Sequence, residues 1–366
     1  MPDETSGEAL PSPEEFASPP EDSEETRALR TENASLRKRL RALRGGEALI
    51  VRAVQESYAD PPDLTVPAPP KQPKRKAEEI ALLHVTDWQL GKLTESYSVA
   101  VAAKRIAQLA EKTVRITETR RSAASIDEIV VLVGGDIVEG ESVFPHQAHE
   151  IEQSVFEQSV KSAPAILTRL LLALLRTFKR VRVHCVCGNH GDPPRRLGQH
   201  PKTNWDRVAY EVARVALLGA EDSPRKELAS RLELHIAEAW YAPFNVYDWG
   251  GILIHGHEVK GGFAGFPWYG VGRRAWGWID AIDEPWEHIY LGHFHQHVSA
   301  CLNRRIFYAT GSPESDNVFA QQHLAAAGWP SQRLQFFDRE WGVIADHQIL
   351  LTEPGERLPQ KVRQGA

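Results

Sequence analysis

The sequence predicts an α/β fold, because short apolar runs alternate with helical patterns in its first half and strands crowd together in its second half. Helical patterns lie at residues 99–121 and 147–178, and Pro164 is expected to start a second helix within the latter. The apolar runs between and around these helices have the length of buried strands. They lie at residues 80–85, 127–133 and 181–186.

The second half predicts one helix, at residues 203–218, followed by closely spaced strands. These strands are expected at residues 232–236, 244–247, 252–255, 288–291, 298–301 and 305–308. Residues 334–351 predict one or two strands more. We find no internal repeat.

The N-terminal part differs in composition from the rest of the chain. Residues 1–25 contain no Lys or Arg and are rich in Pro, Glu and Ser, which predicts a disordered acidic tail. Residues 26–58 predict a helix with leucines every seven residues, which indicates either a short coiled coil that forms a homodimer or binds a partner, or a solvated basic helix. A Pro- and Lys-rich linker at 59–78, a globular domain at 79–351 and a C-terminal tail at 352–366 complete the expected organisation.

Composition limits the classes of function. The 366 residues carry a net charge of −6, so any contact with nucleic acid needs a local basic patch rather than a basic surface throughout. Three cysteines do not form a disulfide framework. There is no signal-peptide pattern and no apolar run long enough to span a bilayer, so we expect a cytoplasmic protein that is not held in a membrane.

Polar side chains that bind metals follow the ends of five predicted strands. These residues are Asp87, Asp136, Asn189, His255, His293 and His295. Ligands of open α/β sheets bind just beyond the carboxyl ends of strands, so the six side chains are expected to share one site. Carboxylate and imidazole groups without thiolates favour Mn, Fe, Zn or Ni. A bridging Asp can hold two cations about 3.5–4 Å apart, a pair that activates water and neutralises a phosphoryl group.

The order of these motifs resembles that of the calcineurin-like metallophosphoesterase superfamily, over about residues 80–311. The motifs are Asp87-Trp-Gln89, Gly135-Asp136, Gly188-Asn189-His190, His255-Gly256 and Gly292-His293-Phe-His295. The resemblance implies a four-layer α/β/β/α sandwich of two mixed sheets flanked by helices. It also implies a hydrolase of phosphoric esters that uses in-line attack by a hydroxide shared between two divalent cations. We expect Mn²⁺, because the amide oxygen of Gln89 favours an oxygen-loving cation.

The resemblance also implies roles for individual residues. Asp87, Asp136 and His295 would hold one metal ion. Asp136, which bridges, would hold the second ion together with Asn189, His255 and His293. His190 would contact the scissile phosphate and assist the leaving group. Gln89 departs from the family, which has His there; its neutral amide is a weaker ligand, so we expect looser binding at the first site.

The expected substrate is DNA, because the motifs look like those of phage-type members and of DNA-repair nucleases within the superfamily. The segment between His257 and Trp286 carries Lys260, Arg273 and Arg274 among aromatic residues, which suits nucleic-acid binding. Its six glycines favour a mobile loop over hydrophobic packing on the sheet. The resemblance further implies a phosphate-facing His146 or His149, and His257 is expected to line the site.

Two other functions fit the same sequence. One is a phosphodiesterase or phosphatase for a small nucleotide or cyclic nucleotide, which needs no basic groove. The other is a non-catalytic scaffold in which Gln89 marks a degenerate first metal site.

Overall fold

The computed structural model describes residues 27–35, 37, 69, 71, 77–144, 147–193, 200, 202–219, 226–261, 265–315 and 328–352. The chain divides into two units, residues 1–56 and 57–366. In the first unit, residues 27–35 form an exposed helix, and the side chain of Leu29 is in solvent. The expected acidic tail at 1–25, the heptad leucines after Leu29 and most of the expected linker and C-terminal tail lie outside the described residues.

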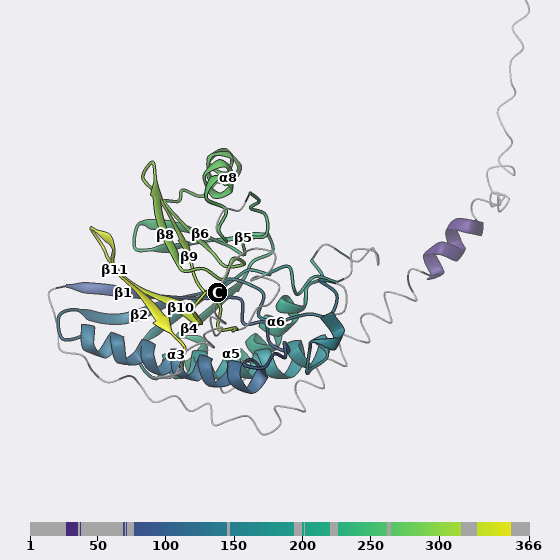
Figure 1. Ribbon diagram of the computed structural model, residues 1–366, viewed down its shortest axis with the longest axis horizontal. Helices are drawn as coiled ribbons and strands as arrows, with labels where there is room; N and C mark the ends of the chain where they lie inside the picture. The colour runs from purple at the N-terminus through teal and green to yellow at the C-terminus, as the bar shows by residue number, and fades with distance from the viewer. Residues whose placement is uncertain are drawn as a thin grey trace, which may run out of the picture. The chain divides into compact units, whose positions relative to one another are not determined.

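Two mixed sheets form the centre of the second unit (Figure 1). The first sheet has the strand order β11-β10-β1-β2-β3-β4, and its last four strands are parallel to one another while β10 and β11 form antiparallel pairs. Its strands are β1 (Glu78–Val85), β2 (Ser125–Val133), β3 (Arg180–Cys185), β4 (Leu232–Ile236), β10 (Ser331–Asp338) and β11 (Gly342–Leu350).

The second sheet has the strand order β5-β6-β7-β9-β8, in which β6, β7 and β9 are parallel and the two edge strands are antiparallel to their neighbours. Its strands are β5 (Tyr241–Val246), β6 (Trp249–Ile254), β7 (His288–Leu291), β8 (Val298–Leu302) and β9 (Arg305–Ala309). The strands expected from the sequence are therefore present in both sheets.

Helices cover the outer face of each sheet. Three lie along the first sheet and α8 lies on the second sheet (Figure 1). They are α3 (Val99–Arg120), α5 (Ala163–Leu175), α6 (Trp205–Leu218) and α8 (Trp268–Ala281). Shorter turns of helix are η1 (Gln147–His149), α4 (Val155–Glu157), η2 (Gln158–Ser162) and α7 (Lys226–Ala229). The four layers confirm the expected α/β/β/α sandwich.

The central strands of the first sheet have uninterrupted runs of apolar residues, because both faces of these strands are buried. In β1, Leu83 and Val85 belong to the core beneath the helices, whereas Ile80 and Leu82 belong to the core between the sheets. Successive side chains of a strand point to opposite faces, so an uninterrupted apolar run supplies both cores.

The helices begin at residues that satisfy free backbone N–H groups. Ser98 accepts a hydrogen bond from the N–H of Val101 at the start of α3. Pro164 lies in the first turn of α5, as its position in the sequence predicts. Asn204 accepts from the N–H of Asp206 at 2.8 Å and starts α6. Among the described residues, we find no helix with the length and apolar character needed to cross a membrane.

One expectation about the fold was wrong. The glycine-rich segment 257–286 was expected to be a mobile loop, but it contains the 14-residue helix α8. Val271, Ala275 and Trp278 are spaced at i, i+4 and i+7, so they form one buried stripe that packs on the second sheet. This apolar spacing outweighs the low helix propensity of the intervening glycines. The alternative interpretation, hydrophobic packing on the sheet, holds for the inner face of α8.

Candidate metal centre

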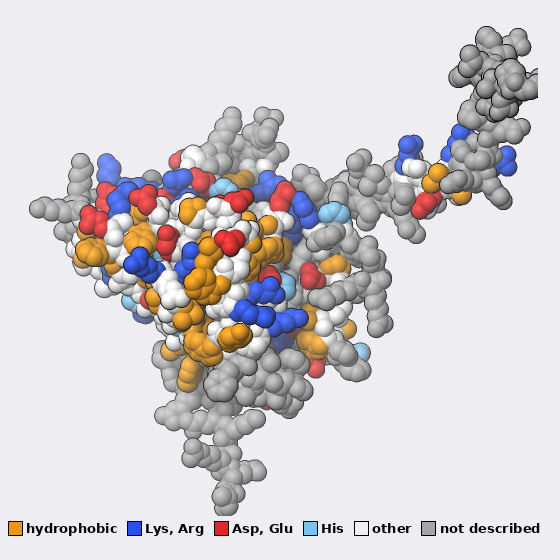
Figure 2. Space-filling model, turned by 90° about the horizontal axis from the view of Figure 1, so that it is seen from above, with side chains coloured by type: hydrophobic (Ala, Val, Ile, Leu, Met, Phe, Trp, Pro, Cys, Tyr) orange, Lys and Arg blue, Asp and Glu red, His pale blue; other side chains and the backbone are white. Residues whose placement is uncertain are grey.

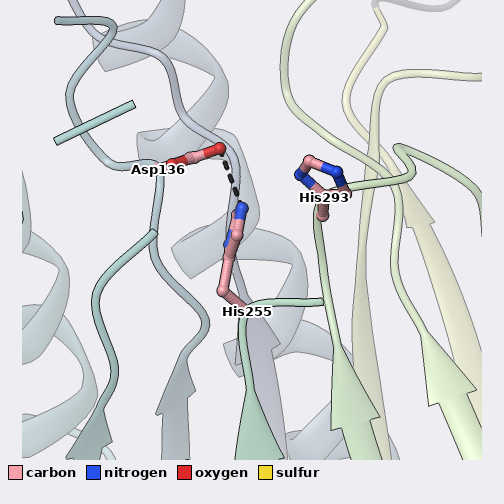
Figure 3. A group of neighbouring side chains, drawn as sticks. All are labelled: Asp136, His255 and His293. Atoms are coloured by element: carbon pink, nitrogen blue, oxygen red, sulfur yellow. Dashed lines mark ion pairs between the residues drawn. The ribbon is translucent and has the colours of Figure 1, made fainter. Parts of the chain in front are cut away.

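The predicted ligands lie where strands of the two sheets end. Asp136 follows β2, His255 follows β6 and His293 follows β7. Figure 3 shows these three side chains pointing toward one another from separate segments of the chain. One ligand atom from each lies within 4.8 Å of the others, so a single cation can contact all three. The strand ends thus bring together side chains that are up to 157 residues apart (293 − 136).

Backbone hydrogen bonds hold these segments together. The N–H of Asp87 donates to the carbonyl of Gly135, and the N–H of Gln89 donates to that of Asp136, both at 2.9 Å. The N–H of Gly292 donates to the carbonyl of His255 at 2.8 Å. The loops after β1 and β2, and those after β6 and β7, are therefore linked in pairs.

Asp136 lies between two histidines of the site. Its side chain is buried, its Oδ1 accepts from the N–H of His190 at 2.7 Å, and its Oδ2 lies 2.9 Å from Nε2 of His255. The contact with His255 is close but lacks hydrogen-bond geometry, so we treat it as a contact between charges. A carboxylate that faces imidazoles on two sides is well placed to bridge cations.

The ring of His255 is oriented by a backbone carbonyl. Its Nδ1 lies 2.8 Å from the carbonyl oxygen of Gly134, which directs Nε2 toward Asp136. A histidine whose second nitrogen donates to a carbonyl presents the other as a metal ligand. Burial opposes protonation, but the carboxylate of Asp136 raises the pKa of His255 to about 10. A divalent cation at this position would replace the proton that the carboxylate otherwise attracts.

Asp87 connects the first sheet to the two histidines after β7. Its oxygens accept from the N–H of His293 at 3.1 and 2.9 Å. Its Oδ1 lies 3.4 Å from Nε2 of His295, whose Nδ1 lies 3.3 Å from Oε2 of Glu314. Glu314 also pairs with Lys92. The carboxylate of Glu314 therefore orients His295 as Gly134 orients His255.

Several predicted ligands have strained backbones. Five of the eight described non-glycine residues with positive φ belong to the predicted metal site. They are Asp87 (55°), Gln89 (44°), Asp136 (49°), His293 (64°) and His295 (52°). Left-handed conformations of non-glycine residues cost free energy and concentrate at functional sites, where the surrounding structure holds them. Strain collected at five predicted ligands favours a function for this region over simple packing.

The site also contains buried oxygens that lack a hydrogen bond. Gln89 is 2% exposed, and neither its Oε1 nor the Oδ1 of Asn189 has a hydrogen-bond partner among the described residues. A buried acceptor without a partner costs roughly 1–3 kcal/mol, so its persistence calls for a ligand. Amide oxygens, carboxylates and imidazoles form a donor set that divalent cations accept. The residues present therefore fit a metal ion.

His190 lies beside Asp136 but is fixed by a different group. Its Nδ1 is 2.9 Å from the carbonyl oxygen of Glu139 and 3.2 Å from Oε2 of the same residue. Burial opposes protonation, but the carboxylates of Asp136 and Glu139 raise the pKa of His190 to about 10. A protonated imidazole at the edge of the site can donate to a phosphate oxygen.

Two glycines allow the close approach of the site loops. An added Cβ at Gly188 would lie 2.0 Å from Oδ1 of Asp136, and one at Gly292 would lie 2.4 Å from Oδ2 of Asp87. Neither position has room for a side chain unless a predicted ligand moves.

Sequence reasoning missed the residue that holds the loop of Asp136. Asp206, in the first turn of α6, is fully buried and accepts four backbone hydrogen bonds. Its Oδ2 accepts from the N–H groups of Asp136 (2.8 Å) and Gly188 (2.9 Å). Its Oδ1 accepts from those of Ile137 (3.0 Å) and Val138 (3.1 Å). The acidic residue next to a helix start was visible in the sequence, but its partners were not.

The predicted substrate residues are distributed unevenly. His257 is half-buried, with its ring centroid 5.5 Å from that of His255 and 6.3 Å from that of His293, so it borders the site. Burial lowers its pKa. His149 is exposed on η1, and His146 lies outside the described residues. The three predicted cations are exposed on α8 and on the loop before it: Lys260, Arg273 and Arg274.

The fold and the clustered side chains define an α/β/β/α sandwich with a candidate metal centre at its strand ends. No family model matches the chain. The SPbeta prophage-derived uncharacterized protein YonJ of Bacillus subtilis (strain 168) is 24% identical over 202 residues, which are 54% of this chain and 47% of that protein. The chain thus matches about half the length of this curated relative.

Solved structures with similar folds share little sequence with the chain. Vps29 of Entamoeba histolytica complexed with zinc is 11% identical, with a TM-score of 0.34 over 74% of this chain and 99% of that one. Yfce, a phosphoesterase from E. coli, is 13% identical, with a TM-score of 0.30 over 74% and 99%. An archaeal phosphodiesterase is 10% identical, with a TM-score of 0.30 over 74% and 99%. At these identities and TM-scores, we infer function from the site's own side chains.

Proposed function

We propose that the chain is a metal-dependent phosphoesterase that holds two divalent cations. The cluster of Asp136, His255 and His293 carries this proposal, because three ligand atoms within 4.8 Å of one another can contact a single cation. One ion would be held by Asp87, Gln89, Asp136 and His295. The other would be held by Asp136, Asn189, His255 and His293. Nitrogen and oxygen ligands favour Mn²⁺, with Fe, Zn or Ni as alternatives.

When bound, such cations neutralise the charge on a phosphoryl group and lower the pKa of water. The chain's own residues position the groups around them. His190 is held by Glu139, which directs its other ring nitrogen, Nε2, to within 3.9 Å of Asp136. We assign His190 the contact with the scissile phosphate and the delivery of a proton to the leaving oxygen. Asp136 would be shared by both cations.

The proposed substrate is a phosphodiester of DNA. Two observations support it: the motif order resembles phage-type members of the metallophosphoesterase superfamily, and the curated relative is encoded by a prophage. The exposed cations of α8 described below are compatible with a polyanionic substrate. His257 and, outside the described residues, His146 are proposed as further contacts to it.

Hydrolysis assays test this function directly. The full chain with Mn²⁺ is expected to cleave a labelled DNA strand and a chromogenic phosphodiester, and Asp136→Asn is expected to abolish both activities. Asp127→Asn is the matched control, because Asp127 lies on β2 too but is exposed at the opposite end of it. Cleavage of the chromogenic diester without cleavage of DNA would point to a small nucleotide as substrate. No hydrolysis of any diester with Mn²⁺, Fe²⁺, Zn²⁺ or Ni²⁺ would overturn the proposal.

The N-terminal helix is proposed to recruit a partner or to dimerise rather than to catalyse. None of the predicted metal ligands comes from residues before Asp87. Since β1 begins at Glu78, a deletion that ends at residue 76 spares the sheet. We expect this deletion to leave hydrolysis unchanged and to alter the oligomeric state. Loss of turnover in a folded deletion variant would contradict this division of roles.

A further inference from the structure

The outer face of α8 exposes aromatic side chains that a folded domain usually covers. Tyr269 is 77% exposed and Trp276 is 63% exposed. They lie on one side of the helix with Arg273, at spacings i, i+4 and i+7, while Val271 and Trp278 on the other side are buried. Exposed aromatic side chains that gather on one face mark interaction sites more often than isolated ones do.

Among the described residues, no carboxylate forms an ion pair with the cations around this face. Lys260, Arg273, Arg274 and Arg304 are exposed, and none of them forms an ion pair within the part of the chain that the structure describes. Some exposed cations elsewhere on the domain are paired, for example Lys179 with Asp127, Arg180 with Glu233, and Lys202 with Glu238. A face with unpaired cations offers its charge to an external anion.

We define the α8 face as the exposed residues on the outer side of α8 and on the loops at its two flanks: Lys260, Tyr269, Arg273, Arg274, Trp276 and Arg304. The loop residue Lys260 packs on the helix, because an added Cβ at Gly270 would meet its carbonyl oxygen at 2.0 Å. Arg304 lies in the turn between β8 and β9, whose neighbours Leu302 and Arg305 line a groove together with Trp276. Figure 2 looks down on the side where α8 lies and shows hydrophobic side chains beside a group of Lys and Arg.

The groove between α8 and the β8–β9 turn adds an apolar recess to this surface. Its volume is about 200 Å³, and its wall includes Trp276, Ile279, Leu302 and Phe307. The side chain of Arg305 is already engaged at this wall, because it stacks 4.0 Å from the ring of Trp286. A flat, uncharged group such as a base can enter the groove while its phosphates remain near the cations.

A chain of aromatic contacts connects the start of α8 to the candidate metal centre. Phe294 lies in sequence between His293 and His295, and its ring centroid is 5.4 Å from that of Phe266. Phe266 in turn lies 4.7 Å from Trp268, the first residue of α8. The loop that carries two predicted ligands therefore packs on the segment that leads into the α8 face.

We propose that the α8 face binds a single-stranded polynucleotide. The phosphates contact Lys260, Arg273, Arg274 and Arg304, while bases stack on Tyr269 and Trp276. Stacking on aromatics within a basic surface is how single strands are held without reading their sequence, and a duplex hides the faces of its bases. The acidic residues Asp280, Asp283 and Glu284 follow at the C-terminal end of α8, and they limit the surface on that side. This inference deepens the proposed function by naming the form of substrate and where it is held.

Fluorescence anisotropy with the full chain in EDTA tests the binding without cleavage. The probes are labelled 20-nucleotide oligo-dT, oligo-U of the same length and a DNA duplex. We expect both single strands to bind more tightly than the duplex. Trp276→Ala is expected to weaken single-strand binding about tenfold, since a stacked base contributes roughly 1–3 kcal/mol. Arg273→Ala with Arg274→Ala is expected to lower the slope of log affinity against log salt by about 1.4, or about 0.7 for each phosphate that is no longer neutralised.

Trp341→Ala is the matched control, because Trp341 is 76% exposed in the turn between β10 and β11 and lies outside the α8 face. It is expected to bind oligonucleotides as the parent does. The cations of residues 27–44 are present in every variant, so a difference between the two tryptophan variants reports on α8 alone. Equal affinities of Trp276→Ala and the parent, or preference for the duplex, would overturn the inference. Mn²⁺ binding measured on the same variants in EDTA-free buffer separates this result from failure of the metal centre.

Discussion

Replacement of Asp206 by Asn is expected to weaken the candidate metal centre without touching a predicted ligand. The substitution keeps the size of the side chain but exchanges one acceptor oxygen for an NH₂ group. If the amide nitrogen takes the place of Oδ2, the N–H groups of Asp136 and Gly188 lose their acceptor. Those two groups hold the loop that carries Asp136 against the loop that carries Asn189.

The magnitude follows from the two broken hydrogen bonds and from the charge removed. Each bond to a charged group contributes roughly 1.5–3 kcal/mol, so breaking two costs about 3–6 kcal/mol. Burial and the carboxylate of Asp136 raise the pKa of Asp206 to about 6, so removal of its charge offsets part of this cost. A net loss of about 2 kcal/mol at the Asp136 loop corresponds to a loss of metal affinity of more than tenfold.

The assay is calorimetric titration of the metal-free full chain with Mn²⁺, beside urea unfolding of the same samples. Asp206→Asn is expected to bind Mn²⁺ at least tenfold more weakly while it remains folded at 25 °C. Glu211 lies in the same helix and pairs with Arg214 on its surface, so Glu211→Gln is expected to leave Mn²⁺ affinity unchanged. Unaltered Mn²⁺ affinity in Asp206→Asn would refute the positioning role of Asp206.

Three further outcomes follow from the structure. Gln89→His is expected to tighten the weaker of two Mn²⁺ binding events, because imidazole binds divalent metals more strongly than a neutral amide; identical titrations of parent and variant would contradict this. Glu314→Gln is expected to weaken Mn²⁺ binding by less than His295→Ala does. Glu314 orients a predicted ligand rather than acting as one. Burial lowers the pKa of His288 to about 4 in the folded chain. As pH falls below about 6.5, His288 becomes protonated in the unfolded chain before it does so in the folded chain, so the free energy of unfolding decreases until about pH 4. This residue is 3% exposed, and its share of the loss between pH 7 and pH 5 is about 2 kcal/mol, so urea unfolding of His288→Phe is expected to show a shallower pH dependence by that amount; equal slopes would contradict it.

The candidate metal ligands could be predicted because their signal is local. Each stands within a few residues of the end of an apolar strand, and the carboxyl ends of neighbouring strands meet at one edge of the fold. The structure brings Asp136, His255 and His293 together as this reasoning requires. Asp87 and His295 lie together as well, with Oδ1 and Nε2 3.4 Å apart.

The residues that hold these ligands could not be predicted in the same way. Asp206 is 70 residues from Asp136, and Glu314 is 19 residues beyond His295. Asp206 lies in the first turn of α6 and Glu314 lies in the loop after β9, and neither forms a motif with its neighbours. Only the packed loops show that one carboxylate accepts four backbone N–H groups and that the other orients an imidazole.

The segment 257–286 shows how composition can mislead. Its glycines indicated a loop, whereas the spacing of Val271, Ala275 and Trp278 specified a helix with one buried side. The prediction that Arg273 and Arg274 are available to a ligand depends only on their exposure, which the helix provides. Where glycine content and apolar spacing disagree, the spacing is the more reliable guide. Burial of an apolar stripe stabilises a helix by more than the low helix propensity of its glycines destabilises it.

The most direct test of the account is the number of divalent ions that the full chain binds. After removal of metal with EDTA and titration with Mn²⁺, elemental analysis of the desalted protein is expected to find two ions per chain. Asp136→Asn is expected to lose both, because Asp136 is the shared ligand, whereas Asp127→Asn keeps them. A parent protein that binds no divalent ion, or an Asp136→Asn variant that binds as the parent does, would contradict the claim that Asp136, His255 and His293 form a metal centre.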